Sequence, residues 1–161
     1  MKELIGRTIK EVYINEDGTV MKFITDIGDM YYQCEGDCCS ETWFADIIDS
    51  DFFLCNPVSH KEYTRLVTDV EELDIPCWLG ELANRDNRGR QEYERVYGYK
   101  IKAKINFDSQ LSRCICDLVI IFRNSSNGYY GGSVEFQGKG RLSLSTVDDT
   151  YTKLTGDWRS E

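Results

Sequence analysis

The chain has 161 residues, the length of about one domain, and 41% of them are hydrophobic. This content excludes a disordered chain, because it supplies enough apolar surface for one core. The net charge of −9 argues against direct binding to nucleic-acid phosphates, which needs a surface rich in Lys and Arg. An acidic chain can instead bind a basic protein face or imitate a polyanion, or its charge can serve solubility alone.

The start of the chain, MKELIGRTIK, has no apolar run of the length that a signal peptide needs. No stretch approaches the ~18 apolar residues of a membrane-spanning helix. Seven cysteines without a signal are typical of reduced thiols in the cytoplasm, and the odd number excludes complete pairing within the chain. We therefore expect a cytoplasmic protein that does not enter a membrane.

The first third of the chain predicts a β-meander. Residues 10–34 contain three short runs rich in Val, Ile, Tyr, Phe and Thr, separated by turn sequences at Asp17-Gly18 and Ile27-Gly28-Asp29. Alternation places Val12 and Ile14 on one strand face.

Residues 38–49 predict a short helix. Trp43, Phe44, Ile47 and Ile48 recur at i, i+1, i+4 and i+5, which is one stripe of a helix. Asp37 precedes this stripe and is suited to act as its N-cap. The charged residues 69–93 that follow further on predict a connecting excursion with an exposed loop.

The second half returns to β patterns. Residues 97–105 alternate between apolar side chains and lysines, and residues 114–122 place Cys114, Cys116 and further apolar side chains on one face. Asn127-Gly128 then predicts a tight hairpin turn. Together these patterns predict a single α+β domain over residues 1–144, with a mostly antiparallel sheet in two meanders and one short packed helix. Residues 145–161 form a polar tail.

Three cysteines in QCEGDCCSE, namely Cys34, Cys38 and Cys39, are candidate metal ligands. A closed zinc site needs four ligands, and this spacing matches no common zinc motif. Redox use and burial as structural thiols are the alternatives, and burial is the commonest state of free cysteine. The prediction is thus no cofactor, with zinc as the alternative.

A second candidate site is a ligand-binding surface made of Asp37, Asn127, Tyr129 and Tyr130. Aromatic side chains beside a turn can stack on a base, although they more often serve the hairpin itself. The sequence has no Gly-rich phosphate loop, no His-Glu-x-x-His motif and no Gly-x-Ser-x-Gly motif, so it predicts no catalytic residues and no enzyme.

The segments DCCSETWFADI and SNGYYGGSVEF together resemble a family of small domains of unknown function found largely in bacteriophages, prophages and their bacterial hosts. The matching positions are Asp37, Cys38 and Cys39, and the run 126–130. The likeness covers about residues 3–137 and includes an acidic connection between the halves. The family usually has a histidine where this chain has Cys34, an exchange that keeps metal-ligand character but not general-base character.

The resemblance implies a phage-type gene that works in the cytoplasm of a bacterial host. With the acidic charge, it predicts a non-enzymatic accessory or host-interaction protein, and activity against host defence is one form that such a role takes. Its partner would be a basic host protein or a nucleotide second messenger. A metal-dependent hydrolase that uses the region of Cys34, Cys38 and Cys39 is the alternative from another class.

Overall fold

The computed structural model describes residues 1–50, 52, 63–75, 91–107, 110–128, 131–139 and 150–155. These residues form one short 3₁₀ turn, η1 (Lys2–Leu4), and an antiparallel β-structure. The strands are β1 (Thr8–Asn15), β2 (Val20–Thr25), β3 (Gly28–Gly36), β4 (Ser40–Ser50), β5 (Tyr63–Asp74), β6 (Tyr93–Phe107), β7 (Gln110–Ser126), β8 (Gly132–Lys139) and β9 (Tyr151–Lys153).

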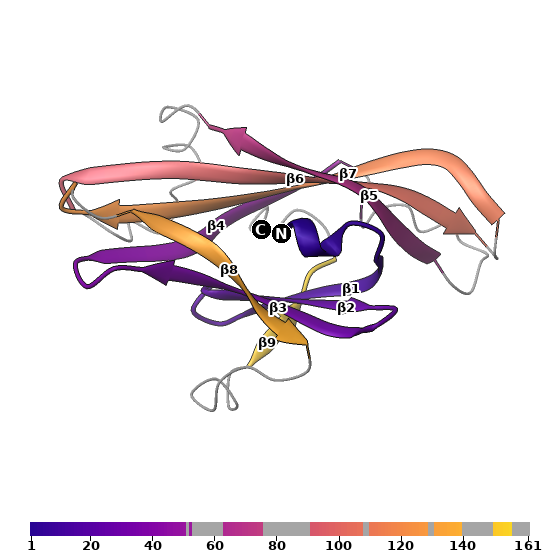
Figure 1. The fold of residues 1–161 in the computed structure, drawn as a ribbon, viewed down its shortest axis with the longest axis horizontal. Helices are drawn as coiled ribbons and strands as arrows, with labels where there is room; N and C mark the ends of the chain where they lie inside the picture. Colours follow the sequence, from indigo (N-terminus) through magenta and orange to yellow (C-terminus); the bar gives the residue numbers. More distant parts are fainter. Residues whose placement is uncertain are drawn as a thin grey trace.

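The strands follow the order β4-β7-β6-β5-β1-β2-β3-β8, and β9 pairs with β1. Figure 1 shows two layers, with β5, β6 and β7 above and β1, β2 and β3 below. The layers join where β1 and β5 pair over a short register, Thr8 with Leu66 and Ile9 with Arg65. At the other end of the order, β8 follows β7 in the chain but pairs with β3 in the lower layer.

One core fills the space between the layers. The alternation predicted from sequence is confirmed there, because Val12, Ile14, Ile101 and Ala103 are all buried. The turn η1 lies between the layers in Figure 1, and its Leu4 is completely buried. The first residues of the chain therefore belong to the core.

The predicted helix is wrong, and with it the α+β fold class, because residues 40–50 form strand β4. Phe44 pairs with Phe122, but Asp46 pairs with the preceding residue of β7, Ile121, so Ala45 is an extra residue in a β-bulge. The bulge interrupts the two-residue alternation. It places buried Phe44 and buried Ile47 three positions apart, which imitates the period of a helix.

The predicted excursion over residues 69–93 is also wrong over residues 69–74 and at residue 93, since β5 continues to Asp74 and β6 begins at Tyr93. Asp69 and Glu71 of β5 lie opposite lysines of β6. Lys102 Nζ lies 3.3 Å from Glu71 Oε2 and 3.9 Å from Asp69 Oδ2. Cross-strand charge pairing thus supports a strand where the local sequence alone indicates a loop. Residues 76–90 lie outside the described part.

Two further corrections concern the end of the chain. The predicted hairpin at Asn127-Gly128 is wrong, because residues 127–131 connect β7 to a strand that pairs with β3 instead of β7. Gly128 nevertheless has φ +91°, a conformation that favours glycine. Within the predicted tail, residues 151–153 form β9, and Leu154 is buried in the main core.

Two glycines that pair with each other allow β8 and β4, the last and first strands of the order, to approach closely. Gly36 at the end of β3 pairs with Gly132 at the start of β8, and both lie against the start of β4. A Cβ atom at Gly36 would lie 2.9 Å from Ser40 Oγ and 3.2 Å from Thr42 Oγ1. At Gly132 it would overlap Thr42 Oγ1 and lie 2.7 Å from Asn124 Nδ2. Only residues without a side chain allow this approach.

We predict that Gly132→Ala lowers the free energy of unfolding by about 1–3 kcal/mol, because the added methyl group must displace Thr42 and Asn124 in a packed region. Gly131→Ala is the matched control, since a Cβ atom there meets nothing within 4 Å. Urea denaturation of both variants measures the difference. Equal unfolding midpoints for the two variants would contradict the close packing of β8 on β4.

Candidate functional site

A four-residue turn, Asp37–Ser40, connects β3 to β4. The Ser40 backbone N–H donates to the Asp37 carbonyl oxygen at 2.8 Å. Ser40 Oγ lies 3.3 Å from the same oxygen and 3.4 Å from the carbonyl oxygen of Gly131, which precedes β8. The turn is therefore held both internally and by the neighbouring connection. Asp37 is not a helix N-cap, because the structure has a strand where the helix was predicted.

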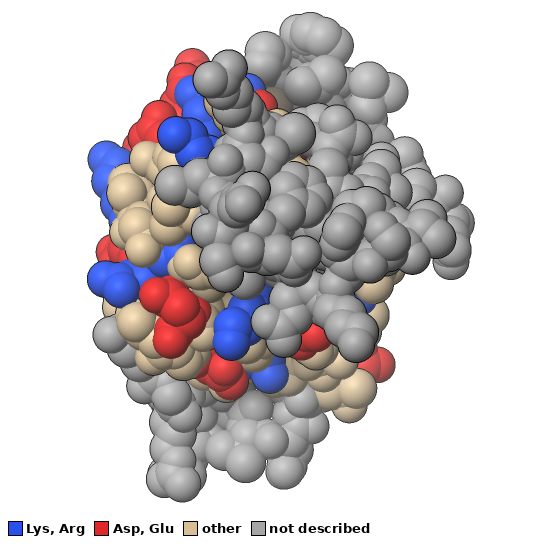
Figure 2. All heavy atoms as spheres, turned by 90° about the vertical axis from the view of Figure 1, so that its right-hand side faces the viewer, with Lys and Arg blue, Asp and Glu red and all other residues tan. Residues whose placement is uncertain are grey.

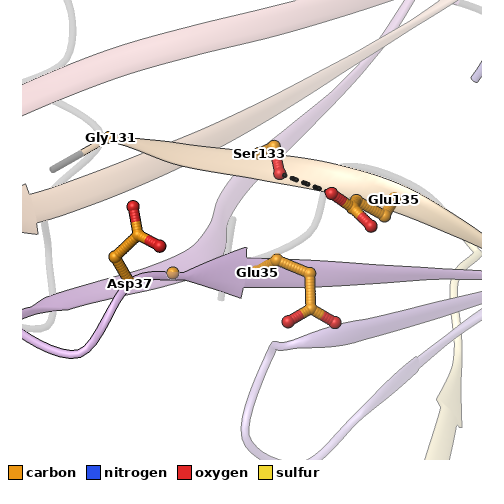
Figure 3. Close-up of a pocket in the computed structure, with 6 residues that line it drawn as sticks. Glu35, Asp37, Gly131, Ser133 and Glu135 are labelled. Carbon is orange, nitrogen blue, oxygen red and sulfur yellow. Dashed lines mark hydrogen bonds between the residues drawn. The ribbon is translucent and has the colours of Figure 1, made fainter.

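A pocket of about 230 Å³ lies beside this turn, between the end of β3 and the start of β8. The register places Glu35 opposite Ser133, so the two side chains share the outer face of the strand pair. Neighbouring Cys34 and Val134 are buried on the inner face. Figure 3 shows the side chains that surround the pocket. The lining residues are Glu35, Gly36, Asp37, Gly131, Ser133 and Glu135.

Three of the residues that line the pocket, Glu35, Asp37 and Glu135, carry carboxylates. Ser133 Oγ donates to Glu135 Oε1 at 3.4 Å, and Gln137 Nε2 donates to Glu35 Oε1 at 3.4 Å. No Lys or Arg of the described residues forms an ion pair with Glu35, Asp37 or Glu135. The pocket is consequently a region of uncompensated negative potential.

Several charged side chains elsewhere form ion pairs. Lys100 Nζ, for example, lies 2.9 Å from Asp117 Oδ2. Figure 2 shows basic and acidic side chains interspersed over the described part of another face of the molecule. That face thus carries charges of both signs, whereas the charged residues that line the pocket are all acidic.

The three carboxylates do not converge on one point. In Figure 3 the Asp37 carboxylate points toward β8, whereas the Glu35 carboxylate points away from it. Across the described ranges, no group of three or more His, Cys, Asp or Glu side chains is placed to hold a metal ion. Carboxylates spread around an open pocket suit the cationic groups of a larger partner better than a single small cation.

The candidate metal ligands are not brought together. Cys34 is 8% exposed and belongs to the core, whereas Cys38 and Cys39 are both exposed in the turn. On a strand followed by a turn, positions 34 and 38 do not share a face as they would along a helix. The structural-thiol prediction therefore holds for Cys34 and the buried Cys116 but is wrong for Cys38 and Cys39.

The Sγ atoms of Cys38 and Cys39 lie 3.6 Å apart. Their hydrogen bond raises the pKa of the Cys39 thiol above its usual value. No helix dipole acts on either thiol, since no helix begins here. The pair is therefore an exposed dithiol.

The predicted ligand-binding set is divided by the structure. Asp37 lines the pocket, and Asn127 is exposed at the end of β7 without lining it. Tyr129 and Tyr130 lie outside the described residues. Sequence reasoning missed Glu35 and Glu135. The alternation of buried Cys34 and Val134 with outward carboxylates is the signal that would have identified them as surface residues.

In the described part of the chain, no helix has the length and apolarity needed to cross a lipid bilayer.

We predict that alkylation of the folded protein modifies Cys38 and Cys39 at least about tenfold faster than Cys34 and Cys116, because buried thiols react only after local opening. Peptide mass spectrometry after short exposure to iodoacetamide gives the four rates separately. Rapid modification of Cys34 at the rate of Cys38 would contradict its position in the core.

The chain matches no known family model, no curated protein and no solved structure. The resemblance to a phage-borne family therefore stays a prediction from the motifs at residues 37–39 and 126–130. The candidate site is accordingly defined by its own geometry, namely an uncompensated acidic pocket beside an exposed dithiol turn.

Proposed function

We propose that this protein acts by stoichiometric binding of a basic protein, with the acidic pocket between β3 and β8 as the central contact. The observation that carries the proposal is the group of unpaired carboxylates from Glu35, Asp37 and Glu135. Lys or Arg side chains of a partner would supply the missing countercharge. Ser133 and the glycine backbone around the pocket would accept further hydrogen bonds from the same cations.

The net charge of −9 supports this proposal at longer range. An acidic molecule attracts a basic partner during diffusion, which raises the association rate. Surface ion pairs are each worth about 0.2–1 kcal/mol, so three of them contribute roughly a tenfold gain in affinity. The pocket would therefore determine where the partner binds, and the overall charge would raise the rate of encounter.

The other functions expected from sequence have less support. Binding of a nucleotide second messenger relies on Tyr129 and Tyr130, which lie outside the described residues. A hydrolase that uses Cys34, Cys38 and Cys39 together would need all three thiols at one site. Burial of Cys34 on the inner face separates it from the exposed pair.

The resemblance to phage-borne domains gives the proposal a biological setting. In that setting the protein is an accessory factor in the bacterial cytoplasm, and it binds a basic host protein, for instance a component of host defence. An acidic surface that occupies a basic face of such a protein blocks it without any turnover.

We predict that the triple variant Glu35→Gln/Asp37→Asn/Glu135→Gln binds a lysine-rich peptide roughly tenfold more weakly than the unmodified chain, because the three countercharges are lost. Isothermal titration at low ionic strength measures both affinities. Raising the salt concentration should reduce the difference, since screening weakens exposed ion pairs.

A second triple variant, Glu16→Gln/Asp74→Asn/Glu92→Gln, is the matched control. It removes the same number of charges from carboxylates that are exposed elsewhere. It should retain most of the affinity. Equal losses in the two triple variants would show that net charge alone attracts the peptide and would remove the pocket from the proposal.

A further inference from the structure

The turn that carries Asp37 also carries an exposed pair of thiols. Cys38 and Cys39 are both exposed, and their Sγ atoms lie 3.6 Å apart. The backbone on either side is fixed by the hydrogen bond from Ser40 N–H to the Asp37 carbonyl oxygen. The two sulfurs are thus presented to solvent together, at a separation that one shared centre can bridge.

The separation of the sulfurs indicates the geometry of such a centre. Two sulfurs 3.6 Å apart, each bonded at about 2.3 Å to one atom, subtend roughly 100° there. This angle fits a pyramidal or tetrahedral centre and excludes a linear one. A structural zinc ion needs four protein ligands, and the described residues contain no suitable group of even three. A trivalent arsenic atom that already carries one organic substituent needs only two sulfurs to complete a pyramid.

We propose that Cys38 and Cys39 form a bidentate binding site for monosubstituted trivalent arsenicals. When an arsenical of the form R–As=O binds, both S–H bonds break and two As–S bonds form. The arsenic oxygen takes both protons and leaves as water, so no oxidant or reductant is needed.

Because two thiols hold the arsenic atom, a competing monothiol removes the bound arsenical only with difficulty. Once one sulfur has bonded, the second reacts within the same turn at a high effective concentration. A competing monothiol must replace both bonds in succession, whereas a small dithiol forms its own chelate. Resistance to a monothiol combined with displacement by a dithiol is thus the signature of this site.

One equivalent of phenylarsine oxide, added to the reduced and folded protein, tests the proposal by native mass spectrometry. The expected product is a single adduct, heavier by the reagent minus one water. It should persist in excess glutathione and disappear with equimolar 2,3-dimercaptopropanol. Proteolysis should place the arsenic on the peptide that contains Cys38 and Cys39.

Cys38→Ser and Cys39→Ser should each abolish the glutathione-resistant adduct, whereas Cys34→Ala should retain it. The Cys34 variant also tests whether a third sulfur binds the arsenic atom. If Cys34→Ala abolished the adduct, Cys38 and Cys39 would not be sufficient to form the site. An adduct that survives in Cys38→Ser, maps to another peptide or transfers readily to glutathione would overturn the proposal. If a serine variant fails to fold, the peptide map of the unmodified chain decides between these outcomes.

Discussion

The close approach of β8 to β4 through Gly36 and Gly132 is the contact on which the candidate site depends. These glycines oppose one another in the β3–β8 register, and neither has room for a side chain against Thr42 and its neighbours. As a result β4 and β8, which are the first and last strands of the order, lie against each other. The same contact brings the connection before β8 to the turn that follows β3, so residues about a hundred positions apart surround one pocket.

Much of the β-structure could be predicted from sequence where alternation is regular. Residues 97–105 showed their buried face directly, because lysines occupy the other side. In the run from 116 to 122 the predicted face is buried in the main core, and Ile121 on the other side is buried in a second hydrophobic cluster. The helix prediction failed at a bulge, since one extra residue, Ala45, changes a period of two into a spacing of three. The acidic end of β5 was missed because its support comes from lysines thirty residues away on β6.

The candidate site was only partly accessible to sequence reasoning. Asp37 was predicted both as a helix cap and as a ligand-binding residue, and its actual position in a turn follows from the strand that replaces the helix. Glu35 and Glu135 are unremarkable in the sequence, because only the pairing of β3 with β8 makes them neighbours. The cysteine motif was conspicuous, but whether positions 34 and 38 share a face depends on the element that contains them.

The candidate site thus combines two chemistries, with carboxylates in the pocket between β3 and β8 and thiols in the adjoining turn from β3 to β4. The role of the pocket is tested most directly by an NMR titration of the isotope-labelled protein with a lysine-rich peptide. The amide signals that shift first should belong to residues 35–37 and 131–135, at a stoichiometry of one peptide to one protein. Shifts spread evenly over the acidic surface, or centred on residues 127–130 alone, would contradict a binding site between β3 and β8.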